Sequence, residues 1–149
     1  MKLLIQRVSE AAVETGGKTV GQISRGCLVL LGISNGDTEE KADKAVDKIA
    51  KLRLFADENG KTNLSLTDIG GGLLVVSQFT LCADCRRGNR PGFSGAAEPR
   101  RAEELYEYFL KKAALRLGSV QHGIFGADMK VRLVNDGPFT IILEDGNGL

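Results

Sequence analysis

Apolar positions in the first third of the chain predict three strands. Residues 3–13 are typical of extended structure, and Gly16-Gly17 is a hairpin signal that lets residues 19–23 return. Residues 26–33 form a continuous apolar run, which is the mark of a strand buried on both faces. This part of the sequence therefore predicts the start of a β-sheet.

Two segments show helical spacing instead. Residues 38–55 carry apolar side chains on one helical face, and Asp37 with Glu40 gives an N-terminal cap pattern. The second helix is predicted to begin at Pro99, whose missing N–H costs nothing in the first turn, and to end at Gly118.

The remaining pattern predicts further strands. Residues 73–81 are one candidate, and residues 129–135 and 139–144 are predicted to pair across a turn at 136–138. Strands and helices do not alternate strictly, so we expect an α+β fold with a mixed, largely antiparallel sheet and two main helices. We expect one domain over residues 1–149, with a flexible tail at 146–149.

Composition narrows the functional class. The chain has 149 residues, 42% hydrophobic and 26% charged, which is typical of a globular protein, and no apolar run is long enough to span a membrane. Net charge is only +1, but residues 86–101 carry five arginines against Glu98. Residues 82–97 also form a long predicted loop, so a local basic surface suits a partner with a few phosphates.

Three cysteines and one histidine offer little chemistry by themselves. The number of cysteines is odd, and the apolar run at the N-terminus is too short for a secretory signal. Both observations favour reduced thiols and a cytoplasmic setting. Cys82 and Cys85 form a Cys-x-x-Cys, but they lack a following helix and two further zinc ligands. Because His122 has no recognisable nucleophile beside it, we expect a structural or surface role for it and no metal or cofactor.

Ser77-Gln78-Phe79-Thr80 ends an otherwise apolar strand with polar groups. Polar side chains just before a long loop are well placed to meet a ligand. In a strand, Ser77 and Phe79 would point to one face and Gln78 and Thr80 to the other. The alternative is an edge strand whose polar groups are simply satisfied.

Asn135-Asp136-Gly137-Pro138-Phe139-Thr140 is first of all a turn signal. The residue before a proline is normally restricted, but Gly137 lacks the Cβ that clashes. The Gly137–Pro138 bond could therefore be cis, which would turn two carbonyl groups to the same side as paired acceptors.

In order along the chain, these residues resemble the bacterial D-aminoacyl-tRNA deacylase family. The ordered pair Ser-Gln-Phe-Thr and Asn-x-Gly-Pro-x-Thr is highly specific, although Phe139 stands where the family more often has valine. The segments that carry the resemblance are residues 4–8, 28–32, 60–64, 75–81, 90–94, 127–129 and 135–140.

The resemblance implies a barrel-like α+β fold and an activity. Such enzymes hydrolyse the ester between a D-amino acid and the ribose at the tRNA 3′ end, as homodimers with sites at the subunit interface. Gly137-Pro138 would enter the partner's site, hold the α-amino group and leave no room for an L side chain. Met129, Asn135 and Arg7 would belong to the same substrate site, and Arg7 would brace the Gly-Pro turn.

The resemblance also implies RNA-assisted catalysis, in which a ribose hydroxyl helps to activate water. Ser77, Gln78, Phe79 and Thr80 would position the ester and stabilise the oxyanion through backbone N–H groups. We doubt a nucleophilic role for Thr80, since no base is committed to it. Glycyl-tRNA should also be cleaved, because glycine has no side chain to exclude. Basic loop residues that could contact tRNA phosphates are Arg86, Arg87 and Arg90.

Three other interpretations stay open. A non-catalytic RNA-binding dimer would share the basic loop, and a thiol redox protein would need Cys82 and Cys85 exposed together. A related deacylase that clears mischarged L-alanine would need a trans Gly137–Pro138 bond and a wider pocket. No membrane or DNA partner is expected.

Overall fold

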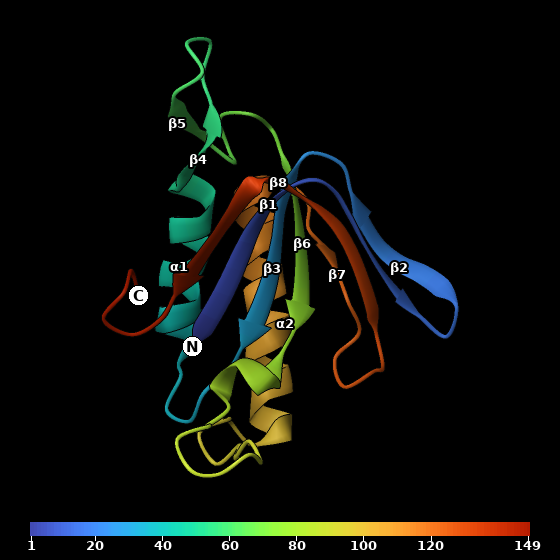
Figure 1. The fold of residues 1–149 in the computed structure, drawn as a ribbon, viewed down its shortest axis with the longest axis vertical. Helices are drawn as coiled ribbons and strands as arrows, with labels where there is room; N and C mark the ends of the chain where they lie inside the picture. Colours follow the sequence, from blue (N-terminus) through green and yellow to red (C-terminus); the bar gives the residue numbers. More distant parts are fainter.

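One mixed sheet organises the molecule in the computed structural model, which describes all 149 residues (Figure 1). The order of five strands is β2-β1-β3-β6-β7, and β8 pairs with β1 from Leu3 to Glu14, along nearly its whole length. Pairs β3–β6 and β6–β7 are parallel and the rest antiparallel, which confirms the predicted mixed α+β fold. The strands are β1 (Lys2–Thr15), β2 (Lys18–Ile23), β3 (Gly26–Gly32), β6 (Gly72–Ser77), β7 (Gln121–His122) and β8 (Lys130–Leu143).

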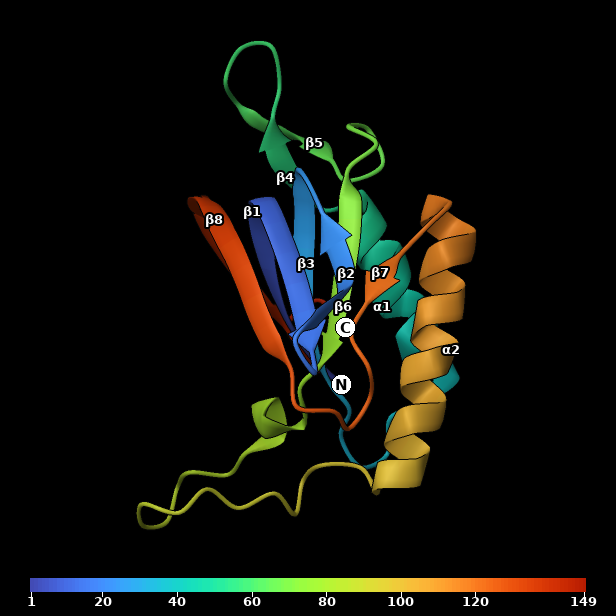
Figure 2. The ribbon, with the colours of Figure 1, turned by 90° about the vertical axis from the view of Figure 1, so that its right-hand side faces the viewer.

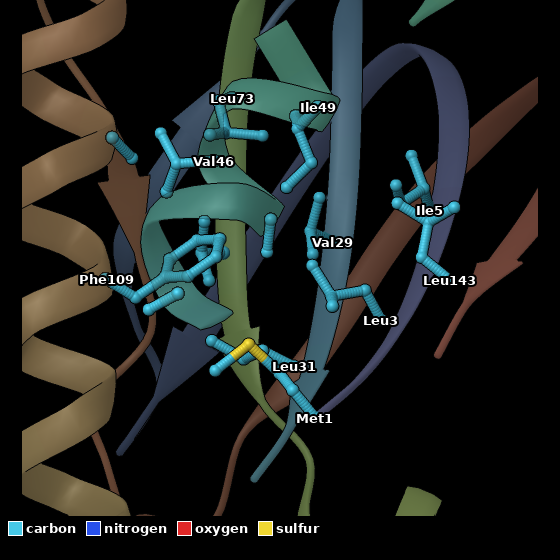
Figure 3. Packing of buried hydrophobic residues seen from close by; sticks show 14 of the residues in the cluster. Met1, Leu3, Ile5, Val29, Leu31, Val46, Ile49, Leu73, Phe109 and Leu143 are labelled. Carbon is cyan, nitrogen blue, oxygen red and sulfur yellow. The ribbon is translucent and has the colours of Figure 1, made fainter. Parts of the chain in front are cut away.

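Both helices, α1 (Glu39–Lys51) and α2 (Pro99–Leu117), cover the same face of the sheet (Figure 2). A cluster of 23 buried hydrophobic residues fills the space between these helices and the sheet, and Figure 3 shows part of it. A second cluster of seven, including Val8 and Leu74, lies where the sheet curls toward a barrel. Neither helix is apolar enough over its length to cross a membrane.

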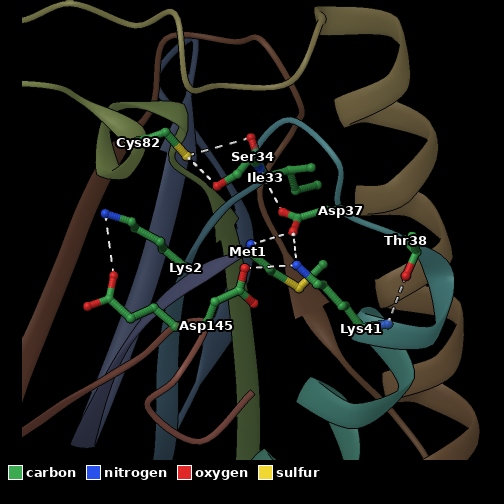
Figure 4. Close-up of polar contacts among 10 residues, drawn as sticks. Met1, Lys2, Ile33, Ser34, Asp37, Thr38, Lys41, Cys82 and Asp145 are labelled. Carbon is green, nitrogen blue, oxygen red and sulfur yellow. Dashed lines mark hydrogen bonds and ion pairs between the residues drawn. The ribbon is translucent and has the colours of Figure 1, made fainter.

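The first helix is shorter than predicted, and its cap is a different residue. It ends at Lys51, and the chain continues as strand β4 (Arg53–Ala56), which pairs with β5 (Thr62–Ser65). Thr38, not Asp37, caps the helix by accepting from the Lys41 N–H (Figure 4). The buried Asp37 carboxylate instead binds the Met1 amino group, a long-range contact invisible to a local pattern.

The strand predicted at 73–81 is also too long. β6 ends at Ser77, and Phe79–Cys82 form the 3-10 helix η1. The reason lies on β3, where a Cβ at Gly32 would come within 3.0 Å of both Gln78 O and Leu81 Cβ. The missing side chain lets the strand end fold over Gly32, so the predicted alternation of faces fails beyond Ser77.

The C-terminal hairpin prediction is wrong in a more informative way. Residues 129–135 and 139–144 do not pair with each other, because both halves of β8 pair with the long strand β1. Val8 pairs with Asn135 and Gln6 pairs with Thr140, so residues 136–139 stand opposite Arg7 alone. We call these four residues the Gly-Pro bulge.

The second helix and the chain end complete the fold. Pro99 stands in the first turn of α2 and Gly118, with φ +85°, ends it, as predicted. At the end of the chain, Asp145 pairs with Lys41 at 2.8 Å and the Asn147 amide donates to Ile142 O. The flexibility of residues 146–149 stays a prediction.

Candidate active site

The end of β6 opens onto a mostly apolar pocket of about 450 Å³. Ser77, Gln78 and Phe79 line one part of its wall, while Phe125 and Met129 line another. A cavity of this size suits a small organic ligand or a nucleoside. Met129 was expected at the site from the resemblance, but no sequence signal pointed to Phe125.

Backbone geometry at Phe79 and Thr80 leaves hydrogen-bond donors at the end of β6, where Phe79 lines the pocket. Both residues begin the 3-10 helix η1, and the first N–H groups of a helix have no acceptor within it. The Gln78 side-chain amide donates to Thr80 Oγ1, which holds that hydroxyl against its own turn. These N–H groups can therefore serve an oxygen that develops negative charge.

No general base contacts Thr80. Its hydroxyl has one hydrogen-bond partner in its own chain, the neutral Gln78 amide, and no carboxylate or imidazole. His122 lies on β7, with its Nδ1 2.9 Å from Gly123 O. A nucleophilic hydroxyl needs a base within hydrogen-bond reach, so the geometry gives Thr80 no activation.

Asp136, Gly137 and Pro138 of the Gly-Pro bulge are exposed on the outer strand β8. The Gly137–Pro138 peptide bond is cis, and Gly137 has φ +138°, a conformation that side chains rarely adopt. A Cβ at this position would also lie 2.8 Å from Arg7 Nη2. Glycine is therefore required here both by the backbone and by its neighbour.

Asn135 joins the two ends of the bulge. Its Oδ1 accepts from the Phe139 N–H at 2.6 Å, and its Nδ2 donates to Phe139 O at 3.3 Å and to Thr140 Oγ1 at 3.2 Å. The Gln6 amide reaches the same Thr140 hydroxyl at 3.3 Å. The Asn-x-Gly-Pro-x-Thr motif thus forms a loop that the Asn135 side-chain amide closes, with Gly137-Pro138 on its outer side.

The Arg7 side chain supports the bulge by hydrogen bonds to two backbone carbonyl groups. Its Nε donates to Asp136 O at 2.8 Å, and its Nη1 donates to Leu54 O in β4 at 2.6 Å. The guanidinium lies 4.9 Å from the centre of the Phe139 ring. Phe139, the departure from the family pattern, therefore stacks on the bracing arginine, a contact that the sequence did not reveal.

The pocket and the bulge lie far apart within one chain. Strands β1 and β3 stand between β8 and β6, and three strand spacings are about 14 Å. Along the strands, Arg7 pairs with Cys27 and Cys27 with Leu73, while Ser77 lies four residues further on, about 13 Å. Followed along the sheet, these offsets place Gly137-Pro138 about 19 Å from Ser77.

The basic loop is a projecting hairpin-like arm, residues 84–92, closed by two backbone hydrogen bonds between Asp84 and Gly92. Arg86 is not free, because its Nε and Nη2 both donate to the Asp84 carboxylate, and this holds the pKa of Asp84 well below its usual range. Arg87 and Arg90 are exposed and form no ion pair.

The cysteines do not form an exposed redox pair. All three thiols are free. Cys82 is buried with its sulfur 3.4 Å from Ser34 Oγ, and only Cys85 is exposed. Burial raises the pKa of Cys27 to about 12. The thiol redox interpretation required Cys82 and Cys85 to be exposed together, and that requirement is not met.

Comparison with known proteins decides the family. The model of the D-Tyr-tRNA(Tyr) deacylase family matches residues 4–144. The chain belongs to this family. The resemblance predicted from the sequence is confirmed, and with it the expectation of a hydrolase acting on ester bonds of aminoacyl-tRNA.

Curated D-aminoacyl-tRNA deacylases are similar over nearly their whole length. The protein from Lactobacillus delbrueckii subsp. bulgaricus is 56% identical, with 97% of this chain and 99% of the relative covered. The one from Geotalea uraniireducens is 59% identical, with coverages of 97% and 93%.

Two solved structures share the deacylase-family fold. One, titled a c-Myc DNA unwinding element binding protein, has a TM-score of 0.91 at 44% identity, covering 97% of this chain and 98% of its own. A probable eukaryotic D-amino acid tRNA deacylase has a TM-score of 0.84 at 17% identity, with coverages of 95% and 97%. The predicted deacylase-like, barrel-like fold is therefore confirmed.

We expect Arg7→Lys to lower the free energy of unfolding by about 1–2 kcal/mol, because lysine cannot donate to both Leu54 O and Asp136 O in a fork. Urea denaturation at fixed protein concentration measures this change. Arg25→Lys is the matched control, since Arg25 stacks on Phe55 and forms no side-chain hydrogen bond or ion pair. Equal stability of both variants would show that Arg7 does not support the bulge.

Proposed function

We propose that the chain hydrolyses the ester between a D-amino acid and the terminal ribose of tRNA, and spares L-aminoacyl-tRNA. As a family member, the enzyme is a D-aminoacyl-tRNA deacylase. The proposed site combines the pocket at Ser77–Thr80 of one subunit with the Gly-Pro bulge of a second.

The distance between the pocket and the Gly-Pro bulge within one chain is the observation that supports a cross-subunit site. A bulge about 19 Å from Ser77 cannot touch a substrate bound there. A second copy can supply it, because both elements are exposed. Deacylation with chiral selection therefore requires a homodimer in which each subunit completes its partner's site.

Strand β8 is suited to such pairing. It is an edge strand of 14 residues, and its other edge has no partner in the chain. Val134 and Ile142 each remain 50% exposed on it. Long edge strands with exposed apolar side chains tend to self-associate, so the dimer would cover this surface.

Chiral selection would follow from steric exclusion of L side chains by the Gly-Pro bulge. The carbonyl groups of Gly137 and Pro138 would accept the α-amino group of the substrate, with Met129 on the pocket wall and Asn135 and Arg7 fixing the bulge. An L side chain would then point into the backbone of the bulge, whereas a D side chain points away. Glycine has no side chain to exclude, so glycyl-tRNA should also be cleaved.

Catalysis would rely on positioning and on the RNA. The backbone N–H groups of Phe79 and Thr80 would stabilise the oxyanion that forms when water attacks the ester carbonyl. The ribose hydroxyl next to the ester would help to activate that water. Neutral Gln78 and Ser77 would orient the ester without transferring a proton.

Binding of tRNA would use positively charged side chains on the arm, outside the pocket. Arg87 and Arg90 are free to meet phosphates, whereas Arg86 is largely occupied by Asp84. Such contacts give affinity without sequence specificity. Free thiols and a tRNA substrate are consistent with a cytoplasmic enzyme.

The decisive assay follows amino-acid release from D-tyrosyl-, L-tyrosyl- and glycyl-tRNA with the purified protein. We expect rapid release from the D and glycyl substrates and little from the L substrate. Equal release from the D and L substrates would contradict exclusion by the bulge. Release from none would favour the non-catalytic RNA-binding interpretation.

The cross-subunit arrangement can be tested by complementation. Ala127→Trp fills the pocket and Gly137→Val disrupts the bulge, so each variant alone should be inactive. After unfolding and refolding together in equal amounts, about a quarter of the sites should combine an intact pocket with an intact bulge. Recovery of about a quarter of the wild-type rate supports the arrangement. A mixture as inactive as its parents would rule it out, provided that size-exclusion chromatography shows dimers.

Thr80→Ala and Thr80→Val should each keep more than a tenth of the wild-type kcat, since both lose the hydroxyl but keep the backbone N–H. Single-turnover kinetics at saturating enzyme separates this from binding. A fall of about 10³ or more in the rate of chemistry, with binding intact, would instead identify the hydroxyl as a catalytic group.

A further inference from the structure

Two phenylalanines remain exposed together at the rim of the pocket. The Phe79 side chain is 57% exposed and that of Phe93 is 37% exposed. Their ring centres lie 5.0 Å apart at an angle of 61°, an edge-to-face arrangement. We call them the aromatic pair. Leaving two adjacent aromatic rings in water is unfavourable, so a partner that covers them gains affinity.

The two rings come from different parts of the site. Phe79 begins η1 and lines the pocket, whereas Phe93 follows the arm. The base of the arm is fixed by Asn35, whose backbone N–H donates to Gly95 O and whose side-chain amide donates to Ser94 O. The ring of Phe93 is thus held by an ordered base, while the arm itself projects from the body (Figure 2).

Free positive charge lies beyond the aromatic pair. Arg87 and Arg90 stand on the arm between the Asp84–Gly92 closure points, exposed and without ion pairs. A path from the pocket therefore passes an exposed aromatic surface and then reaches two unpaired guanidinium groups. Stacking rings followed by cations are the elements that proteins use to bind single-stranded nucleic acid.

We propose that the aromatic pair stacks the base of the unpaired nucleotide that precedes the terminal adenosine of tRNA, with Arg87 and Arg90 on the phosphates further along. The inference rests on the proposed function, which puts the terminal aminoacyl-ribose in the pocket. The next base then emerges at the rim beside Phe79. Stacking on phenylalanine tolerates any base, so it suits an enzyme that accepts many tRNAs.

The test compares two substrates of one enzyme, D-tyrosyl-tRNA and D-tyrosyl-adenosine. Only the first has the nucleotide that would stack. Phe93→Leu should lower kcat/KM for the tRNA substrate relative to the adenosine substrate by about tenfold, mainly through KM. Phe93→Tyr should restore the ratio, because it keeps an aromatic face. Leu115→Ala, which removes a 75% exposed side chain from α2, is the control and should leave the ratio unchanged.

A second measurement addresses the charges. In the double variant Arg87→Glu/Arg90→Glu, the slope of log kcat/KM for D-tyrosyl-tRNA against log salt should become shallower by about 0.7 for each phosphate that the arm no longer binds. The same variant should show no altered salt dependence with D-tyrosyl-adenosine.

The outcomes separate the two hypotheses. Wild-type protein that hydrolyses neither substrate would refute the proposed function, and the stacking proposal with it. Active wild-type protein with equal reductions on both substrates in Phe93→Leu would mean that Phe93 only supports η1. A change of oligomeric state in that variant would mean that the second subunit covers the aromatic pair, and either result would overturn the stacking proposal.

Discussion

The guanidinium of Arg7 is the contact on which the outer part of the fold depends. It lies on β1, the strand that pairs with β2, β3 and β8, and it faces the point where β8 departs from regular pairing. With its side chain only 15% exposed, it binds carbonyl oxygens on two separate segments, in β4 and in the bulge. A partly buried donor group of this kind fixes the segments it joins, because losing its hydrogen bonds would cost free energy.

The position of Arg7 on β1 explains how one sheet holds both the apolar pocket and the exposed Gly-Pro bulge. The pocket needs an apolar wall and free backbone donors, which the end of β6 provides over Gly32. In the proposed function the bulge needs exposed backbone acceptors on a rigid support, which an outer strand can provide without disturbing the core. Separating them across the sheet lets each be built with local chemistry. Under the proposed function, the catalytic unit is the assembly of two chains.

Local signals predicted what local chemistry decides. Pro99 and Gly118 defined α2 correctly, because a proline in the first turn and a left-handed glycine after the last turn act within the helix itself. The errors arose where a distant group decides the outcome. Asp37 looked like a cap but binds Met1, and the strand through Phe79 stops because Gly32 on another strand admits the turn. The candidate site residues were predicted from ordered motifs, yet neither their spacing across the sheet nor the stacking of Phe139 on Arg7 can be read from periodicity.

The distribution of the three thiols gives the molecule a natural point of attachment. Cys27 is buried in the sheet with a raised pKa, and Cys82 is buried beside Ser34, so both sulfur atoms are shielded from solvent. Cys85 alone faces solvent, and it lies within the arm. A thiol-directed fluorophore would therefore label the unmodified enzyme at one place, a few residues from the two free arginines. Its emission could report arrival and departure of tRNA in real time, without engineering any cysteine in or out.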